Sequence, residues 1–369
     1  RSYFAEPTID RSTHPIDPWR WIETAPPTSD LGVAESVFTV GNGYLGVRGN
    51  PEEGRDYTLN GTYVNGLHET WNIQHAEDAY GLARVGQSIV NAPDAKTIRI
   101  YVDDEPFRIS RADLSYYERS LDFRDGVLRR SIEWRTPAGK RVLMDFTRLV
   151  SLTDRHLGIE EVRIVLPEDS APVMLSSQIM NRQDGQDEFG SATSASRPAS
   201  PEDVTQATVN TGSDPRRADH FQSRVFVPVM QVNEGEKIAL GYRIKNSGMA
   251  LVVGADHDFS TSNDFYVSSS AAPDMAKVQY HVDARPGEEI VLTKYFSYHD
   301  SYRASVSELM DRVEETLQRA HKHGPMDYVE SQREWLADFW DRADVEIPDQ
   351  PELHLCLIPH GPGRRVLTW

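Results

Sequence analysis

The chain has 369 residues, of which 38% are hydrophobic, and a formal net charge of −18. This hydrophobic content can fill one large core or two smaller ones, which excludes disorder over the whole chain. The negative charge disfavours binding to nucleic acid or anionic lipid, because both present phosphate groups. A soluble protein that acts on a neutral ligand fits this composition.

Targeting features are sparse along the sequence. No apolar run is long enough to cross a bilayer, and the first residues lack an apolar signal core. The single cysteine, Cys356, excludes an intrachain disulfide and a cysteine metal cluster. Asn60 begins an Asn-Gly-Thr sequon, which we interpret as a chance match. We therefore expect a cytoplasmic protein with neither membrane nor nucleic-acid partners.

Residues 35–50 read ESVFTVGNGYLGVRGN and place four glycines within an apolar run. Three of them fit the pattern G-x-G-x-x-G, but no helical period follows, so the pattern does not indicate a dinucleotide site. The glycines predict either a tight turn between strands or the close approach of another segment.

From about residue 36 to residue 300 the sequence is typical of β-structure. Short apolar or alternating runs are separated by turn sequences such as Arg124-Asp125-Gly126 and Arg285-Pro286-Gly287. The expected strands are Thr97–Val102, Val127–Trp134, Arg141–Phe146, Leu157–Leu166, Val173–Ile179, Arg224–Val229, Ile238–Ile244, Leu251–Val253, Val278–Val282 and Ile290–Tyr298. This pattern predicts a mainly β fold, a large antiparallel β-sandwich. Residues 181–219 are polar and predict a long surface loop with one short strand near Val204–Val209.

After Asp300 the hydrophobic period becomes helical. The apolar positions that follow this period are Val306, Leu309, Met310, Val313 and Leu317. Gly324 is expected to end this first helix, and a second helix is expected from Met326 to about Arg342. Beyond Asp349, prolines and glycines occur where a further helix would run.

The residues alone display no catalytic constellation. The sequence contains no G-x-S-x-G, P-loop or H-E-x-x-H motif. Glu160 and Glu161 are adjacent on an expected strand and therefore point to opposite faces, so they cannot flank one glycosidic bond. Residues 103–105, Asp-Asp-Glu, fit a turn. His321 and His323 are expected at a helix end, where the dipole favours cations. We assign no catalytic residue and no metal ligand.

Several segments in order resemble the N-terminal domain of glycoside hydrolase family 65, which contains maltose, trehalose and kojibiose phosphorylases. These segments are ESVFTVGNGYLGVRGNPEEG, GTYVNGLHE, LSYYERSLDFRDGVLRRSIEWRTPAGKRV, FTRLVSLTDRHLGIEEVRI and WDRADVEIPDQPEL. The resemblance runs from about Pro18 to Leu353. It implies a supersandwich of the galactose-mutarotase type, a two-helix linker and then an (α/α)6 barrel that carries the general acid and the phosphate site.

The resemblance also implies a reaction for the intact enzyme. Most family members cleave an α-linked glucose disaccharide with phosphate and invert the anomeric centre, giving β-glucose 1-phosphate. Inorganic phosphate is the co-substrate, and no organic cofactor or metal is needed. Because phosphate attacks the sugar directly, one protein acid suffices. Dimers are common in the family, so a homodimer is expected.

On this resemblance we divide the chain into four parts. They are an N-terminal extension (1–17), the β-sandwich domain (18–300), a helical linker (301–343) and the truncated start of the barrel with an atypical tail (344–369). We expect the rest of the barrel to be missing and the fragment to be inactive. Whether the chain alone is an enzyme is left open. The tail after Leu353 departs from the family, and we interpret it as the result of a frameshift in the gene or in its sequencing.

Five side chains are candidates for the rim of a sugar site that the barrel completes. They are Tyr44, Arg48, Asn50, His68 and Trp71. The alternative is a structural role in a turn, or as buried loop anchors. Two other functions stay open: a stand-alone carbohydrate-binding module, which needs an exposed aromatic platform, and an interaction sandwich without a ligand. The sequence does not identify the disaccharide.

Overall fold

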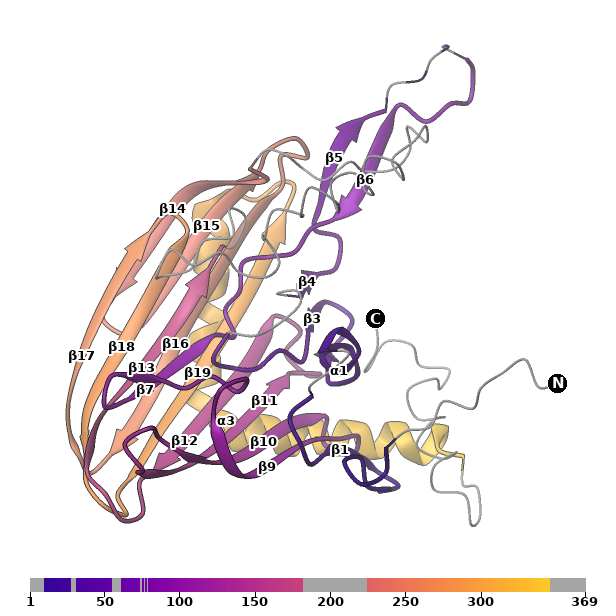
Figure 1. Ribbon diagram of the computed structural model, residues 1–369. Helices are drawn as coiled ribbons and strands as arrows, with labels where there is room; N and C mark the ends of the chain where they lie inside the picture. The colour runs from indigo at the N-terminus through magenta and orange to yellow at the C-terminus, as the bar shows by residue number, and fades with distance from the viewer. Residues whose placement is uncertain are drawn as a thin grey trace.

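Two antiparallel sheets of nine and five strands pack face to face in the computed structural model, which describes residues 10–27, 31–54, 61–73, 75, 77, 79–181 and 224–345 (Figure 1). The larger sheet contains, in spatial order, β1 (Arg20–Glu23), β9 (Asp113–Asp122), β10 (Val127–Arg135), β11 (Arg141–Val150), β12 (Leu157–Val165), β19 (Glu289–Ser301), β16 (Ala250–Thr261), β15 (Lys237–Ile244) and β14 (Phe226–Glu234). The smaller sheet contains β17 (Asp264–Ala272), β18 (Met275–Ala284), β13 (Ala171–Met180), β7 (Ile98–Val102) and β8 (Glu105–Pro106). The predicted antiparallel sandwich is confirmed.

All ten expected strands form, several of them longer than predicted. The run Leu251–Val253 extends to the 12 residues of β16. Two long strands, β9 and β17, were not expected. In β17, DFYVSSSAA, the β-branched and aromatic residues are confined to Phe265, Tyr266 and Val267, so the strand conformation of the serines and alanines after them depends on pairing with β18.

The expected turns are also present. Gly126 and Gly287, which end two of them, have φ values of 64° and 74°, a region open to glycine at little cost. Asp103 and Asp104 adopt φ values of 53° and 64° between β7 and β8, which confirms the turn at residues 103–105. Positive φ at both central residues is typical of a type I′ hairpin turn.

The main hydrophobic core lies between the two sheets. Alternate residues of β18 from Ala276 to Val282 are buried, while the residues between them are half-exposed, as expected for a strand with one face in the core. On the facing sheet, Phe146, Val162 and Leu292 are buried in the same cluster. The sandwich therefore follows from the period-2 pattern of its strands.

Helix α3 (Val306–Ala343) consists of two helical stretches that meet at Gly324, with φ 76° and ψ 164°. Pro325 follows directly, and its ring restricts the conformation of the preceding residue. Ser305 caps the first stretch by accepting a hydrogen bond from the Glu308 N–H at 3.1 Å. The two predicted helices, with their boundary at Gly324, are confirmed.

The first stretch of α3 packs against the outer face of the larger sheet. Leu309, Val313 and Leu317 are buried in a second hydrophobic cluster with residues of β12 and β16. A Cβ atom at Gly254 would lie 2.5 Å from Val313 Cγ1. A glycine on the strand therefore allows the helix to approach the sheet closely.

Six short elements precede the sandwich strands or lie between them. They are α1 (Leu31–Val37), β2 (Val40–Gly41), β3 (Leu45–Val47), β4 (Thr62–Val64), β5 (His68–Asn72) and β6 (Val85–Ile89). Strands β5 and β6 form a hairpin that projects beyond the sandwich (Figure 1). The G-x-G-x-x-G pattern spans β2, a turn and β3, so no helix follows its first strand, as expected.

Several expectations lie outside the described residues. They concern Asn60, Cys356, the strand near Val204–Val209, nearly all of the polar loop, and the tail after Leu353. Within the described ranges, no helix combines the length and the apolar character needed to cross a membrane.

Candidate functional site

The turn between β2 and β3 is fixed by the side chain of Asn42. Its Nδ2 donates to the carbonyl oxygens of Ser151 and Arg155 at 2.6 Å and 3.0 Å, in the connection between β11 and β12. Its Oδ1 accepts from the backbone N–H groups of Tyr44 and Leu45. An asparagine that bonds its own turn in this way holds the apolar strands in a defined register.

Tyr44 projects from this turn into a cluster of polar side chains. Its hydroxyl donates to Asp300 Oδ1 at 2.6 Å, its ring contacts the His156 ring edge-on at 4.3 Å, and the Arg155 guanidinium lies over the ring at 4.6 Å. Burial, with Asp300 beside the hydroxyl, raises the pKa of Tyr44 well above its usual range. Tyr44 therefore stays protonated and acts as a hydrogen-bond donor.

His156 and His299 stack in parallel within the same cluster, with ring centroids 3.9 Å apart. Burial lowers the pKa of both rings, and for His299 the value falls to about 3, with His156 adding to the shift. His156 Nδ1 lies 2.9 Å from the Tyr298 carbonyl oxygen, so this nitrogen must carry the proton. Both histidines are neutral at pH 7, which removes the repulsion that two stacked imidazolium rings would have.

Arg48 and Asn50 lie on the segment that leaves β3 and enters the sandwich. Arg48 Nε donates to Glu35 Oε2 at 3.1 Å, and its Nη2 donates to the Gly32 carbonyl, so this side chain fastens α1. Asn50 is buried, and its carbonyl oxygen accepts from Arg148 Nη1 at 3.1 Å. Gly49 lies between them, where a Cβ atom would be 2.5 Å from Phe38 Cβ. The glycine-rich stretch thus combines a tight turn with a close backbone approach, as its sequence predicted.

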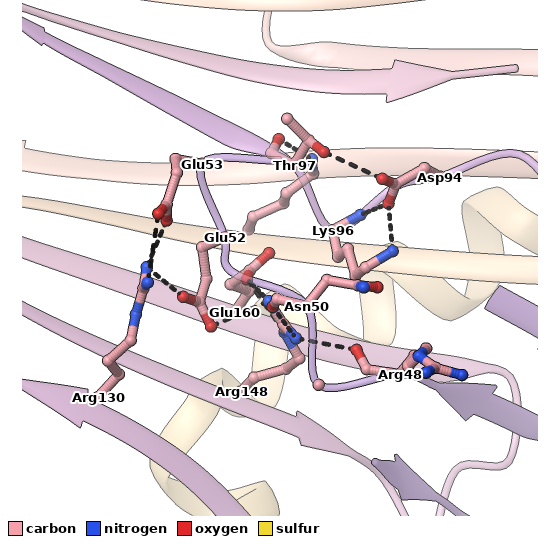
Figure 2. Close-up of polar contacts among 12 residues, drawn as sticks. Arg48, Asn50, Glu52, Glu53, Asp94, Lys96, Thr97, Arg130, Arg148 and Glu160 are labelled. Atoms are coloured by element: carbon pink, nitrogen blue, oxygen red, sulfur yellow. Dashed lines mark hydrogen bonds and ion pairs between the residues drawn. The ribbon is translucent and has the colours of Figure 1, made fainter. Parts of the chain in front are cut away.

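A buried network of arginines and carboxylates surrounds this segment (Figure 2). Arg148 contacts Glu52 and Glu160 at 2.9 Å each, whereas Arg130 contacts Glu52 at 2.5 Å and Glu53 at 2.6 Å. All five side chains are at most 3% exposed. Isolated charges would be costly there, so the pairing holds residues 50–54 against β10, β11 and β12.

Glu160 and Glu161 point to opposite faces of β12, as predicted. Glu160 is completely buried in the network, whereas the side chain of Glu161 is partly exposed. Lys294 is opposite Glu160 on β19 and donates to the carbonyl oxygens of Thr97 and Gln178. Burial lowers the pKa of Lys294 to about 8. The network therefore links both sheets of the sandwich.

His257 lies in the same polar part of the core. Its Nδ1 donates to the Glu236 carbonyl oxygen at 2.6 Å, and its Nε2 accepts from the Ser177 hydroxyl at 2.7 Å. Burial lowers the pKa of His257 to about 3, and the positive charge of Lys294 adds to the shift. A proton on Nε2 would add a charge beside a buried cation, and the Ser177 hydroxyl would then have to accept this hydrogen bond instead of donating it.

We expect stability to fall on acidification because of His257. Its pKa is about 6.5 in the unfolded chain and about 3 in the folded protein, so the unfolded state takes up the proton first. Between pH 6.5 and pH 5 the free energy of unfolding should fall by about 2 kcal/mol more in the wild type than in His257→Gln. Urea titrations at several pH values test this. Equal slopes for His257→Gln and wild type would contradict the prediction.

His68 and Trp71 lie on the projecting β5–β6 hairpin. His68 Nε2 is 2.5 Å from the Tyr302 hydroxyl, and its Nδ1 is 2.8 Å from the Gly66 carbonyl oxygen. Trp71 covers the hairpin partner Gly86, where a Cβ atom would lie 2.3 Å from Trp71 Cζ2. Residues three apart on a strand point to opposite faces, so these two side chains do not form one platform.

The structure thus separates the five sequence candidates into three places. Tyr44 belongs to the cluster with Asp300 and the two histidines, Arg48 and Asn50 belong to the segment in the core, and His68 and Trp71 belong to the hairpin. A role at a sugar rim stays a prediction for each. Sequence reasoning did not select Arg155, His156 or Asp300, because their contacts with Tyr44 span more than a hundred residues and leave no local pattern. It also did not select His299, which joins the cluster by stacking on His156.

Comparison with known proteins identifies the family. A family model described as the N-terminal domain of glycosyl hydrolase family 65 matches residues 21–339. The chain belongs to glycosyl hydrolase family 65. The motif-based resemblance is therefore confirmed over most of the chain.

Relatives within family 65 share this region. The chain is 32% identical over 348 residues to an uncharacterized glycosyl hydrolase of Mycobacterium tuberculosis, covering 93% of this chain and 41% of that protein. It is 29% identical to an α,α-trehalose phosphorylase of Thermoanaerobacter brockii, covering 90% of this chain and 41% of that protein. This chain therefore spans about two fifths of these relatives.

The fold has a solved counterpart. The solved structure of a human-microbiome protein, provisionally named a kojibiose phosphorylase, superposes on this chain with a TM-score of 0.74 at 19% sequence identity. The match covers 94% of this chain and 42% of the microbiome protein. At this identity the match shows the family 65 fold and nothing finer.

Proposed function

We propose that this chain is the N-terminal, non-catalytic region of an inverting phosphorylase that acts on an α-linked glucose disaccharide. The intact enzyme would convert disaccharide and phosphate to β-glucose 1-phosphate and glucose. The observation that carries the proposal is the match to the N-terminal domain of family 65, together with relatives named trehalose phosphorylase and kojibiose phosphorylase.

The buried carboxylates support a scaffold role for the sandwich. Glu52, Glu53 and Glu160 each pair with an arginine in the core. Glu23 also pairs with an arginine, since Arg119 Nη2 lies 2.8 Å from its carboxylate. A general acid must give its proton to a glycosidic oxygen within hydrogen-bond reach. Carboxylates that are buried and paired with arginines cannot reach a glycosidic oxygen. The general acid would then come from a separate catalytic domain.

Within this proposal, the cluster around Tyr44 is the part of the sandwich that faces the sugar site. Hydrogen bonds hold it to Asp300 at the end of β19 and to the connection between β11 and β12. The β5–β6 hairpin follows Tyr44 after a short stretch of chain. Its residue His68 contacts the hydroxyl of Tyr302, which comes two residues after Asp300. A homodimer, a cytoplasmic location, and independence from metals and organic cofactors stay predictions from the sequence.

Phosphorolysis by the purified chain tests the proposal. The chain is incubated with trehalose, maltose or kojibiose and phosphate, and the product is assayed separately as α- and β-glucose 1-phosphate. We expect no turnover by the 369-residue chain. We expect β-glucose 1-phosphate from one of the three sugars when residues 1–353 are fused to the region that follows the matching segment in a family 65 relative such as the trehalose phosphorylase of Thermoanaerobacter brockii.

Each outcome separates the alternatives. Turnover by the chain alone would place a catalytic site within it and overturn the scaffold role. A longer fused protein that forms α-glucose 1-phosphate, or only glucose, would overturn the inverting phosphorylase. Saturable disaccharide binding by the chain alone, with no activity in the longer protein, would favour a stand-alone carbohydrate-binding module.

A further inference from the structure

The outer face of the smaller sheet carries a row of large side chains across four strands. The cross-strand pairs are Tyr266 with His281, His281 with Met174, and Met174 with Tyr101, on β17, β18, β13 and β7. These strands form the layer at the left of Figure 1, remote from the β5–β6 hairpin. The face lies opposite the core and shares no residue with the cluster around Tyr44.

The rings at the edge of this row form an exposed aromatic surface. Tyr266 and His281 stack in parallel, with centroids 4.4 Å apart and planes 7° apart. The stack covers one face of Tyr266, yet 63% of this residue remains exposed, and β17 is the edge strand of the sheet. A large aromatic ring left in water on an edge strand, away from the apolar core, is available to stack against a ligand.

A hollow of about 400 Å³ adjoins the row. Its polar lining includes Asp104, Asp264 and Asp283, and no lysine or arginine contributes to it. Carboxylates accept hydrogen bonds from hydroxyl groups and repel phosphate or other anions. The volume is within the range of small-molecule sites and suits one or two sugar rings.

The lining also argues against a metal ion. Among the described residues, no group of three His, Cys, Asp or Glu side chains is placed to hold one. Ser268 and Gln279 continue the same face beside Tyr266 and His281, since they pair two positions further along the strands. These neutral side chains donate and accept hydrogen bonds, which matches a polyhydroxylated ligand better than a cation.

We propose that this face is a binding site for a neutral oligosaccharide. Tyr266 stacks against the apolar face of one sugar ring, and the three aspartates accept hydrogen bonds from hydroxyl groups along the bound oligosaccharide. The site is independent of the proposed phosphorylase function, because it uses none of the residues near Tyr44. It would hold the protein to a polysaccharide or oligosaccharide without taking part in bond cleavage.

Ligand-observed NMR titration of the purified chain tests this site. The probes are maltoheptaose as an α-glucan, cellohexaose and laminarihexaose as β-glucans, and spermidine as a cation. We expect saturable binding of at least one oligosaccharide. The glycosidic linkage of the oligosaccharide that binds most tightly identifies the class of glucan that the site recognises. Tyr266→Ala should raise the Kd about tenfold, whereas Tyr266→Phe should keep it within about twofold, because stacking needs the ring and not the hydroxyl.

The control is Tyr116→Ala, which removes an exposed tyrosine from β9 of the other sheet and should leave the Kd unchanged. Asp283→Asn should weaken binding without changing the far-UV circular dichroism. The proposal is overturned if no oligosaccharide binds saturably, if Tyr266→Ala binds as wild type does, or if spermidine alone binds. This measurement does not involve phosphorolysis. A failure of the oligosaccharide site can therefore be distinguished from a failure of the proposed phosphorylase function.

Discussion

Arg148→Met is expected to destabilise the sandwich by about 3–5 kcal/mol, because it leaves two buried carboxylates without their shared cation. Arg148 is completely buried and donates to Glu160 Oε1 through Nε at 3.2 Å and through Nη2 at 2.9 Å. Burial raises the pKa of Glu160 to about 7 even though Arg148 opposes the shift. Without Arg148, Glu160 should be protonated at neutral pH. Urea unfolding followed by tryptophan fluorescence measures the loss.

Arg163→Met is the matched control for this experiment. Arg163 lies on the same pair of strands, but it is 45% exposed and pairs with the equally exposed Glu289. Its removal should cost less than about 1 kcal/mol. The double variant Arg148→Met/Glu160→Gln should recover part of the loss, because a neutral amide at position 160 needs no cation beside it and takes up no proton. Equal midpoints for Arg148→Met and Arg163→Met would show that the buried network does not stabilise the fold.

Gly49→Ala is expected to cost about 3 kcal/mol, at the upper end of the usual range for overpacking. The new Cβ would lie 2.5 Å from Phe38 Cβ and 2.7 Å from the Phe38 carbonyl oxygen, and backbone atoms cannot rotate away. Phe38 is itself held, since the Arg119 guanidinium lies over its ring at 4.0 Å and donates to the Gly49 carbonyl. The segment must therefore separate from α1. Thermal and urea unfolding both report the effect.

Gly235→Ala is the control for the close approach. Gly235 has φ 66° in the turn between β14 and β15, and nothing lies within 4 Å of a Cβ built there. Its replacement should cost only about 1 kcal/mol, through backbone strain. If Gly49→Ala is as stable as Gly235→Ala, then the contact with Phe38 is not what requires glycine in this motif.

Most of the fold could be predicted from local patterns. The period-2 runs located ten strands, and the switch to helical spacing after Asp300 located both stretches of α3. Strand β17 was not predicted because its short run of strand formers, Phe265 to Val267, is followed by serines and alanines, and only pairing with β18 extends the strand over nine residues. The length of β16 also exceeded its apolar run, because it pairs with β19 along 12 residues.

The candidate sites could be predicted from the sequence much less completely than the fold. The glycine-rich stretch could be selected from its sequence and contributes, together with the other motif segments, to the family resemblance, whereas a role for it at a sugar site stays a prediction. The partners of that stretch were not predictable, because Arg130 and Arg148 resemble any exposed arginine on a half-buried strand. The oligosaccharide surface likewise combines residues from Tyr101 to Asp283 in chain order.

The sequence by itself therefore determined most of the sandwich strands, both stretches of α3 and the family, since hydrophobic period, turn chemistry and motif spacing are local properties of the chain. Only the tertiary structure decided which charges are buried and which aromatic rings stay in water. Glu53 and Arg130 are 77 residues apart, and Arg148 reaches the Asn50 carbonyl across 98 residues. Such contacts depend on strand register and sheet packing, where a shift of one residue moves every side chain to the opposite face.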